Sequence, residues 1–145
     1  MNIDFFQSIA LSVANERSVD VVFRNIVDSF ADDPNVVLAR IWIIAPGDLC
    51  HKCPWRESCP DQTKCLHLVA SNGSSLHKER WPTLLKGHYR RFPLFTVEPD
   101  SVTATGKIGY IGGTGKAVFR NDILGNSAWL MDPEWAEREK IASFA

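Results

Sequence analysis

The chain has 145 residues and a formal net charge of −1 at pH 7, with 45% hydrophobic and 23% charged residues. This length predicts one domain with its own apolar core, and the balanced charge excludes a strong global attraction to nucleic acid or to anionic membranes. No apolar run is long enough to span a bilayer, and the first residues lack the basic start of a signal peptide. We therefore expect a cytoplasmic protein, in which thiols stay reduced.

Two amphipathic helices are expected at the start of the chain. Apolar side chains recur at helical spacing over residues 3–13 and again over residues 19–30. Ser18 stands where it can cap the second helix, and Pro34 disfavours helical geometry in the residue before it. Neither helix carries a basic stripe, so both are expected to pack rather than to read DNA.

Two strands follow the helices. Residues 36–45 are rich in β-branched and aromatic side chains and apolar on both faces, which is typical of a central strand. Arg40 interrupts this strand; it either pairs with a carboxylate, which is the commoner arrangement, or faces a ligand pocket. The second strand is expected over residues 66–71, closed by the turn signal Asn72-Gly73. The two strands are expected to be antiparallel neighbours.

The segment between these strands holds every cysteine of the chain: Cys50, Cys53, Cys59 and Cys65. Their spacing is Cys-x2-Cys-x5-Cys-x5-Cys. Thiolates so close in sequence can converge on one metal ion or cluster, or pair into disulfides, and a reducing compartment favours the metal. His51 and His67 are weaker candidate ligands, because four thiolates already fill a tetrahedral or cubane site.

The spacing leaves the identity of the metal open. Two zinc knuckles would contain two Cys-x2-Cys pairs, and only one such pair is present. An iron–sulfur cluster held by one loop is therefore the first expectation, zinc the second, and disulfides or redox-active thiols the third. In each case residues 46–65 form a cysteine-rich insert, in which a metal either reports redox state or only fixes a long segment.

The second half of the chain has weaker patterns. Short strands are expected over residues 94–97 and 118–123. The glycine-rich tract 106–116 fails as a phosphate loop, because Tyr110 replaces a required glycine and Ala117 follows the lysine, so a short helix and turn with close backbone packing is expected. Asp132 and Pro133 start a helix that runs to about residue 140, and a strand begins at residue 141.

The order of these elements resembles a GAF domain, the small-molecule-sensing module of bacterial regulators. The resemblance covers nearly the whole chain and rests on the two helices, the two strands and the later motifs Lys107-Ile108-Gly109-Tyr110-Ile111, Thr114-Gly115-Lys116-Ala117-Val118, Asn121-Asp122 and the helix containing Trp135. The stretch Ala39-Arg40-Ile41-Trp42 followed by the cysteine segment is similar to a cysteine-bearing subset at the N-terminus of bacterial enhancer-binding transcription activators and sensor histidine kinases.

The resemblance implies an α+β fold over residues 1–145, a single sensory domain. A GAF-like antiparallel sheet carries the N-terminal helices on one face and a pocket of loops and short helices on the other. The chain is expected to be truncated at the C-terminus, since a GAF sheet normally continues with another strand and a helix. The expected pocket residues are Arg40, Trp42, Trp81, Phe92, Arg120, Asp122 and Trp135.

The resemblance also implies a function. We expect a non-catalytic sensor that binds a small molecule or carries the metal centre, forms a homodimer, and signals to an attached AAA+ ATPase/DNA-binding or histidine-kinase output domain without touching nucleic acid or membrane. One alternative is a thiol-dependent GAF-like enzyme such as a free methionine sulfoxide reductase, although no carboxylate–histidine arrangement stands out near the cysteines. Another alternative is a purely structural, metal-stapled dimerisation domain. A zinc-ribbon nucleic-acid binder would need a basic face.

Overall fold

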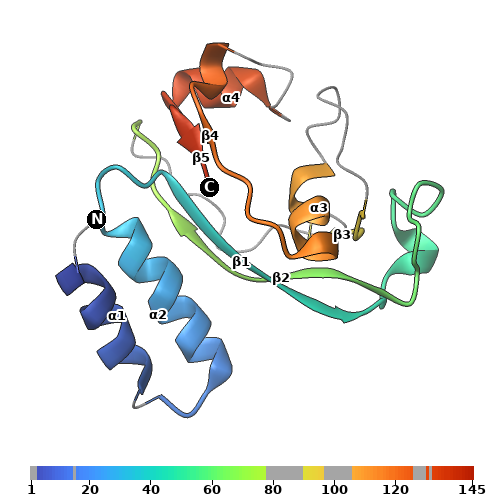
Figure 1. The fold of residues 1–145 in the computed structure, drawn as a ribbon, viewed down its shortest axis with the longest axis horizontal. Coiled ribbons are helices and arrows are strands. Elements are labelled where there is room, and N and C mark those ends of the chain that lie inside the picture. Colours follow the sequence, from blue (N-terminus) through green and yellow to red (C-terminus); the bar gives the residue numbers. More distant parts are fainter. Residues whose placement is uncertain (1–2, 15, 78–89, 97–105, 126–129, 131) are drawn as a thin grey trace. The chain divides into compact units, whose positions relative to one another are not determined.

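The computed structural model describes residues 3–14, 16–77, 90–96, 106–125, 130 and 132–145 (Figure 1). The chain divides into two compact units, one made of Met1–Ile43 with Leu68–Leu85 and one made of Ile44–His67 with Lys86–Ala145. The described residues combine α-helices with antiparallel strands, so the predicted α+β class is confirmed. None of the described helices has the length and apolar character needed to cross a membrane.

The first unit begins with a helical hairpin made of α1 (Ile3–Ala14) and α2 (Val19–Ala31), which confirms both predicted helices (Figure 1). The rings of Phe5 and Phe30 meet edge to face with centroids 5.4 Å apart, so the start of α1 lies beside the end of α2. The predicted cap differs in detail. Ser18 occupies the N-cap position, but its side chain makes no capping hydrogen bond, and its backbone N–H donates to the carboxylate of Glu16.

Three strands form the larger sheet, in the order β1 (Leu38–Pro46), β2 (Lys64–Gly73) and β3 (Arg91–Phe92). Among the described strands β2 is central and β1 lies at an edge, so the expectation of a central strand at 36–45 is wrong. β2 buries Leu66, Leu68 and Ala70, whereas Ile43 and Ile44 of β1 are exposed. Apolar residues on both faces indicate that the faces are covered, but they do not indicate whether both edges are paired.

The end of β2 also differs from the prediction. Asn72 and Gly73 continue the strand instead of turning it, and Ser74 N–H donates to Val37 O at 3.1 Å. A Cβ on Gly73 would collide with the same carbonyl oxygen, so this glycine serves the close approach of β1. The Asn72 side chain donates to Asp28 Oδ1 at 2.6 Å and thereby links β2 to α2. Strand pairing here overrides the turn preference of the dipeptide.

In the second unit β3 precedes the strand that was expected over residues 94–97. It pairs antiparallel with β2, with Leu66 opposite Phe92 and His67 opposite Arg91. Residues 94–96 are not in a strand, and residue 97 lies outside the described residues. The backbone N–H of Phe95 instead donates to the carbonyl of Gly109 at 3.0 Å. This segment therefore faces a helix rather than a neighbouring strand.

That helix is α3 (Gly106–Thr114), which confirms the helix predicted for the glycine-rich tract. A Cβ on Gly109 would collide with the carbonyl oxygen of Pro93, and one on Gly113 would collide with the carbonyl oxygen of Phe95. A Cβ on Gly112 would stand 2.9 Å from the Leu66 side chain. The glycines therefore let the helix backbone approach the segment after β3, as the sequence suggested.

The C-terminal residues form a second, two-stranded sheet. β4 (Arg120–Asn121) pairs antiparallel with β5 (Ser143–Phe144), and η3 (Ile123–Gly125) and α4 (Pro133–Arg138) lie between them in sequence. Asp132 accepts a hydrogen bond from the backbone N–H of Trp135 at 2.8 Å, so its predicted cap is confirmed. The predicted strands at 118–123 and from 141 are present in shorter form.

Candidate metal centre

The cysteine loop, which we define as residues 47–63, joins β1 to β2. Antiparallel pairing closes its ends, where Gly47 N–H donates to Thr63 O at 2.9 Å. Inside the loop the chain makes a single helical turn, η1 (Cys50–Lys52), and then a tight turn in which Arg56 N–H donates to Cys53 O at 3.1 Å. Local backbone bonds therefore shape the loop, and Cys65 follows it on the first residues of β2.

All four cysteines line one pocket, and none of them forms a disulfide. Each side chain is partly buried. Two of the thiols donate to carbonyl groups of the loop itself, Cys50 Sγ to Gln62 O at 3.2 Å and Cys59 Sγ to Asp61 O at 3.3 Å. The structure thus brings the four predicted ligands to one place. Soft thiolate donors of this kind suit zinc or an iron–sulfur cluster.

The other walls of the pocket combine charged and apolar side chains. They include Arg56, Asp61, Arg91, Phe92 and Pro93. Trp55 packs against Phe92 with ring centroids 5.7 Å apart. The indole Nε1–H of Trp55 is buried and has no acceptor within the part of the chain that the structure describes. Such a donor destabilises its surroundings, so the loop is incomplete in polar contacts as it stands.

The thiols sit in an environment that favours their protonated form. Burial raises the pKa of Cys65 to about 11, an effect that Arg91 opposes and Asp48 reinforces. Burial also raises the pKa of Cys59, which accordingly stays neutral near pH 7. Since metals bind thiolates, metal binding here must release protons. Without a metal the same thiols are weak nucleophiles.

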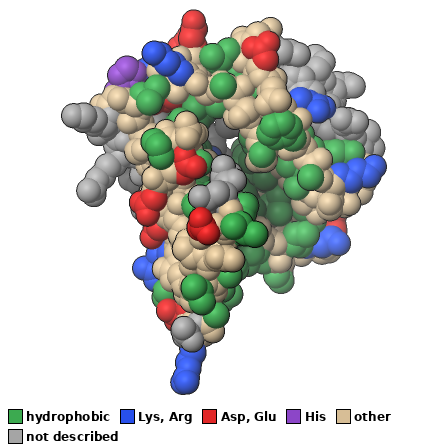
Figure 2. Space-filling view, turned by 60° about the vertical axis from the view of Figure 1, so that its left-hand side comes forward, with side chains coloured by type: hydrophobic (Ala, Val, Ile, Leu, Met, Phe, Trp, Pro, Cys, Tyr) green, Lys and Arg blue, Asp and Glu red, His purple; other side chains and the backbone are tan. Residues whose placement is uncertain are grey.

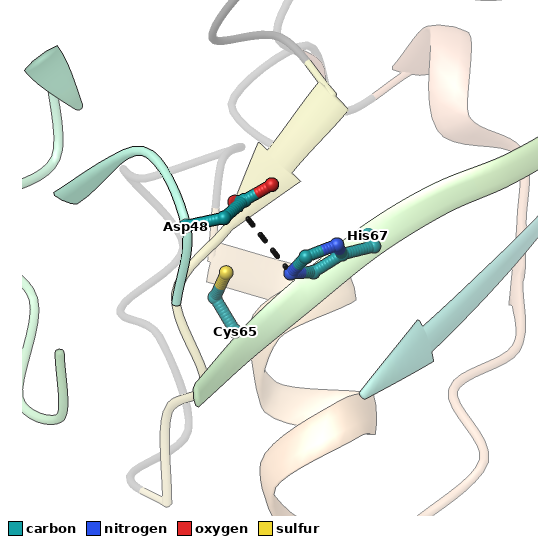
Figure 3. A group of neighbouring side chains, drawn as sticks. All are labelled: Asp48, Cys65 and His67. Carbon is teal, nitrogen blue, oxygen red and sulfur yellow. Dashed lines mark ion pairs between the residues drawn. The ribbon is translucent and has the colours of Figure 1, made fainter. Parts of the chain in front are cut away.

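A second group of ligand-type side chains shares Cys65 (Figure 3). The Sγ atom of Cys65, a carboxylate oxygen of Asp48 and a ring nitrogen of His67 all lie within 4.8 Å of one another. Sequence reasoning considered His67 but missed Asp48, because no ligand spacing connects it to Cys65. The pairing of β1 with β2 places the residue after β1 beside the start of β2. Both this group and the four cysteines could hold a metal ion.

Asp48 and His67 are already engaged by other partners. Arg91 donates to both carboxylate oxygens of Asp48, with Nε to Oδ1 at 2.8 Å and Nη2 to Oδ2 at 2.6 Å. These hydrogen bonds hold the pKa of Asp48 at about 2. His67 Nε2 lies 3.0 Å from Pro46 O, to which it donates, and 3.8 Å from Asp48 Oδ1. Asp48 and His67 therefore form a polar network beside Cys65, and the thiols are the better ligands for a soft metal.

The predicted pocket residues lie in different places. Arg40 and Trp42 are on β1 in the first unit, and the expected carboxylate partner of Arg40 is replaced by the Ser71 hydroxyl, to which its Nε donates at 3.4 Å. Burial lowers the pKa of Arg40. Phe92 is buried in the wall of the cysteine pocket. The others belong to the second unit or lie outside the described residues: Arg120 on β4, Asp122 after it, Trp135 in α4, and Trp81 in the undescribed part.

Comparisons of the chain with protein-family models, with curated proteins and with solved structures gave no match. The GAF resemblance therefore stays a prediction. The functional proposal consequently depends on the chemistry of the cysteine pocket rather than on a relative.

Proposed function

We propose that this chain is the non-catalytic sensory domain of a bacterial signal-transduction or transcription regulator, and that its cysteines hold a metal centre that reports redox or gas state. The observation that carries the proposal is the single pocket lined by Cys50, Cys53, Cys59 and Cys65, with no disulfide among them. A soluble core does not require four convergent thiols, and a metal centre does.

An iron–sulfur cluster is the first choice for this centre and zinc the second. A tetrahedral zinc ion would hold its sulfur ligands about 3.8 Å apart. Among the described residues, no three cysteine sulfurs form a group whose members all lie within 4.8 Å of one another. Thiols that surround a pocket at wider spacing favour a larger inorganic core over a single ion, although a metal would draw the loop closer.

The polar network beside the pocket gives a route from the centre to the sheet. Asp48 in the cysteine loop is clamped by Arg91 of β3, and His67 of β2 donates to the carbonyl of Pro46 at the end of β1. Loss of the metal would return the buried thiols to their neutral form and would change the charge that faces Arg91. A change in the loop is therefore expected to reach β2 and β3.

The first test is hydrogen exchange on protein purified without oxygen, compared with the same protein after exposure to air or nitric oxide. The proposal predicts faster amide exchange over residues 47–67 and 91–95 after treatment, with unchanged exchange in α2. Uniform exchange in all samples, despite loss of the metal, would overturn the sensory role and leave a structural staple.

A thiol-dependent enzyme is the second candidate, because Cys65 lies beside a histidine and a carboxylate, an arrangement used by cysteine nucleophiles. The burial of this thiol weakens the candidate. With a pKa of about 11, the thiolate would be roughly one part in ten thousand at pH 7. An assay with free methionine sulfoxide and a thiol reductant is expected to show no turnover; turnover that is lost in Cys65→Ser would favour the enzyme.

The proposed partners are a second copy of the chain and an attached AAA+ ATPase/DNA-binding or histidine-kinase output domain. The helical hairpin supports the first of these, because apolar side chains lie on its surface: Ile3, Phe6, Leu11 and Val19 are 72%, 54%, 71% and 60% exposed. Figure 2 shows hydrophobic side chains on the helices at the lower end of that view. Sedimentation is expected to show a dimer that Leu11→Glu dissociates; a wild-type monomer at high micromolar concentration would contradict this.

A further inference from the structure

A centre built from four thiolates creates a charge problem that its surroundings must solve. Four thiolates around divalent zinc, or around an oxidised cluster core of the same charge, leave a net charge of about −2. Partial burial of the thiols removes part of the water that would otherwise solvate this charge. A buried charge is costly unless an opposite charge or a set of hydrogen-bond donors compensates it.

Arg91 is the cation best placed to compensate that charge. It lines the pocket together with the four cysteines, and its charge interacts with that of Cys65. The strand register fixes its position, because Arg91 lies opposite His67 and Phe92 lies opposite Leu66, the residue that follows Cys65. Arg91 Nη1 also donates to the carbonyl of Arg90 at 3.0 Å, so three of its nitrogens are held in place.

The ion pair with Asp48 does not cancel the charge of Arg91 at the pocket. The Arg91 side chain is 14% exposed, whereas that of Asp48 is 45% exposed. Water therefore screens the carboxylate more than the guanidinium, and a positive field remains on the side of the thiols. Arg56 also lines the pocket, but it is an exposed residue of the loop and is screened in the same way as Asp48.

From this placement we propose that Arg91 is a positioning residue that balances the charge of the thiolate centre and so sets its metal affinity and, for a cluster, its reduction potential. Asp48 would fix the orientation of the guanidinium, as outer-shell partners do around metal ligands. The inference rests on the proposed four-cysteine metal site and assigns a role to a residue that is not itself a ligand.

The test uses cobalt(II) as a probe of the full-length metal-free protein, with thiolate-to-cobalt absorption as the signal and a competing chelator to obtain the affinity. Arg91→Met removes the charge and is expected to weaken cobalt binding by about tenfold or more. Arg91→Lys keeps the charge and loses the planar clamp, and it is expected to stay within about threefold of wild type. Arg24→Met, a change of an exposed arginine on α2, is the matched control and should leave the affinity unchanged.

A purely structural role for Arg91 makes different predictions. If the clamp on Asp48 were what mattered, then Arg91→Lys and Asp48→Asn would weaken binding as strongly as Arg91→Met. If charge balance matters, Asp48→Asn removes a competing negative charge and leaves the affinity equal to or higher than that of wild type. Should Arg91→Met fail to fold, the lysine and asparagine variants still decide between these outcomes.

For protein reconstituted with an iron–sulfur cluster, charge balance also predicts that Arg91→Met lowers the reduction potential, because reduction adds negative charge to the centre. An unchanged potential together with unchanged cobalt affinity would overturn the inference. A wild-type chain without any thiolate-to-cobalt absorption would overturn the proposed metal site itself, and this result is visible before any Arg91 variant is measured.

Discussion

The helical hairpin and the cysteine loop are held together by different means. In the hairpin, Phe5 meets Phe30 across the two helices, and Val27 of α2 is 2% exposed. In the loop none of the residues 47–63 is fully buried, and the order comes from backbone turns, thiol–carbonyl hydrogen bonds and the ion pair of Asp48 with Arg91. Apolar burial is thus the main source of stability only in the hairpin.

This difference indicates what each region requires in order to keep its structure. A helix pair with a buried seam can fold from its own side chains. A loop that buries a tryptophan N–H without an acceptor and brings four thiols together needs something else to complete it. The two regions should therefore respond to different perturbations, and each prediction below changes one region and asks whether the other responds.

The largest expected effect is the loss of the metal after removal of one thiol. Cys59→Ser, in the middle of the loop, should reduce the metal content to a small fraction of that of wild type, because structural zinc sites contribute about 10–16 kcal/mol of apparent binding free energy that depends on all ligands. Elemental analysis after anaerobic purification measures this. The neighbouring Ser58→Ala is the control and should retain the metal. Helical circular dichroism should be the same in both variants.

The second effect is a steep dependence of metal affinity on pH. Burial raises the pKa of Cys59, and that of Cys65 to about 11, so these thiols hold protons in the metal-free state and must release them on binding. Affinity should therefore rise with pH over the neutral range, by about tenfold per pH unit for each proton released. Chelator competition at pH 6, 7 and 8 measures the slope. A flat profile would mean that thiolates are not the ligands.

The third effect is confined to the first unit. Val27→Ala shortens a side chain that is 2% exposed and should reduce the free energy of unfolding by about 2 kcal/mol. Val19→Ala makes the same change in the same helix at a site that is 60% exposed, so it should have an effect within about 0.5 kcal/mol. Urea unfolding compares the two variants. Metal affinity should be unchanged in both; a parallel loss of metal would show that the regions are not independent.

The smallest effect concerns the start of α2. Ser18 occupies the N-cap position without a side-chain hydrogen bond, so Ser18→Ala should change the stability by less than about 0.5 kcal/mol. Asp132→Ala removes a cap that accepts from the N–H of Trp135 at 2.8 Å and should cost about 1 kcal/mol. Thermal unfolding of the two variants side by side tests this. Equal losses would mean that Ser18 does cap the helix in solution.

Sequence patterns predicted the regular parts of the fold well, because periodicity reports directly on burial. The helices α1 and α2, the glycine-rich α3 and the cap at Asp132 all followed from local signals. Local signals failed where long-range pairing decided the outcome. Asn72-Gly73 has the composition of a turn, but its pairing with β1 keeps it in the strand. The edge position of β1 likewise depends on which strands are neighbours, and composition carries no such information.

The candidate site shows the same division. The four cysteines were visible as a cluster in the sequence, because they are close along the chain. Asp48 and Arg91 were not, since Arg91 is distant in sequence and reaches Asp48 only through the pairing of β3 with β2. A charged residue directly after a strand and another within a short strand give no signal until the register is known. The outer shell of the site was therefore beyond sequence reasoning, although its inner shell was not.

The most direct test is metal and sulfide analysis, with an optical spectrum, of the wild-type protein purified without oxygen. The four-cysteine centre predicts stoichiometric metal, with iron, acid-labile sulfide and a broad visible absorption for a cluster, or zinc without visible absorption as the second possibility. Cys59→Ser prepared in parallel should lack that metal. A wild-type protein that contains no more metal than Cys59→Ser, and whose four thiols all titrate as free, would contradict the existence of the centre.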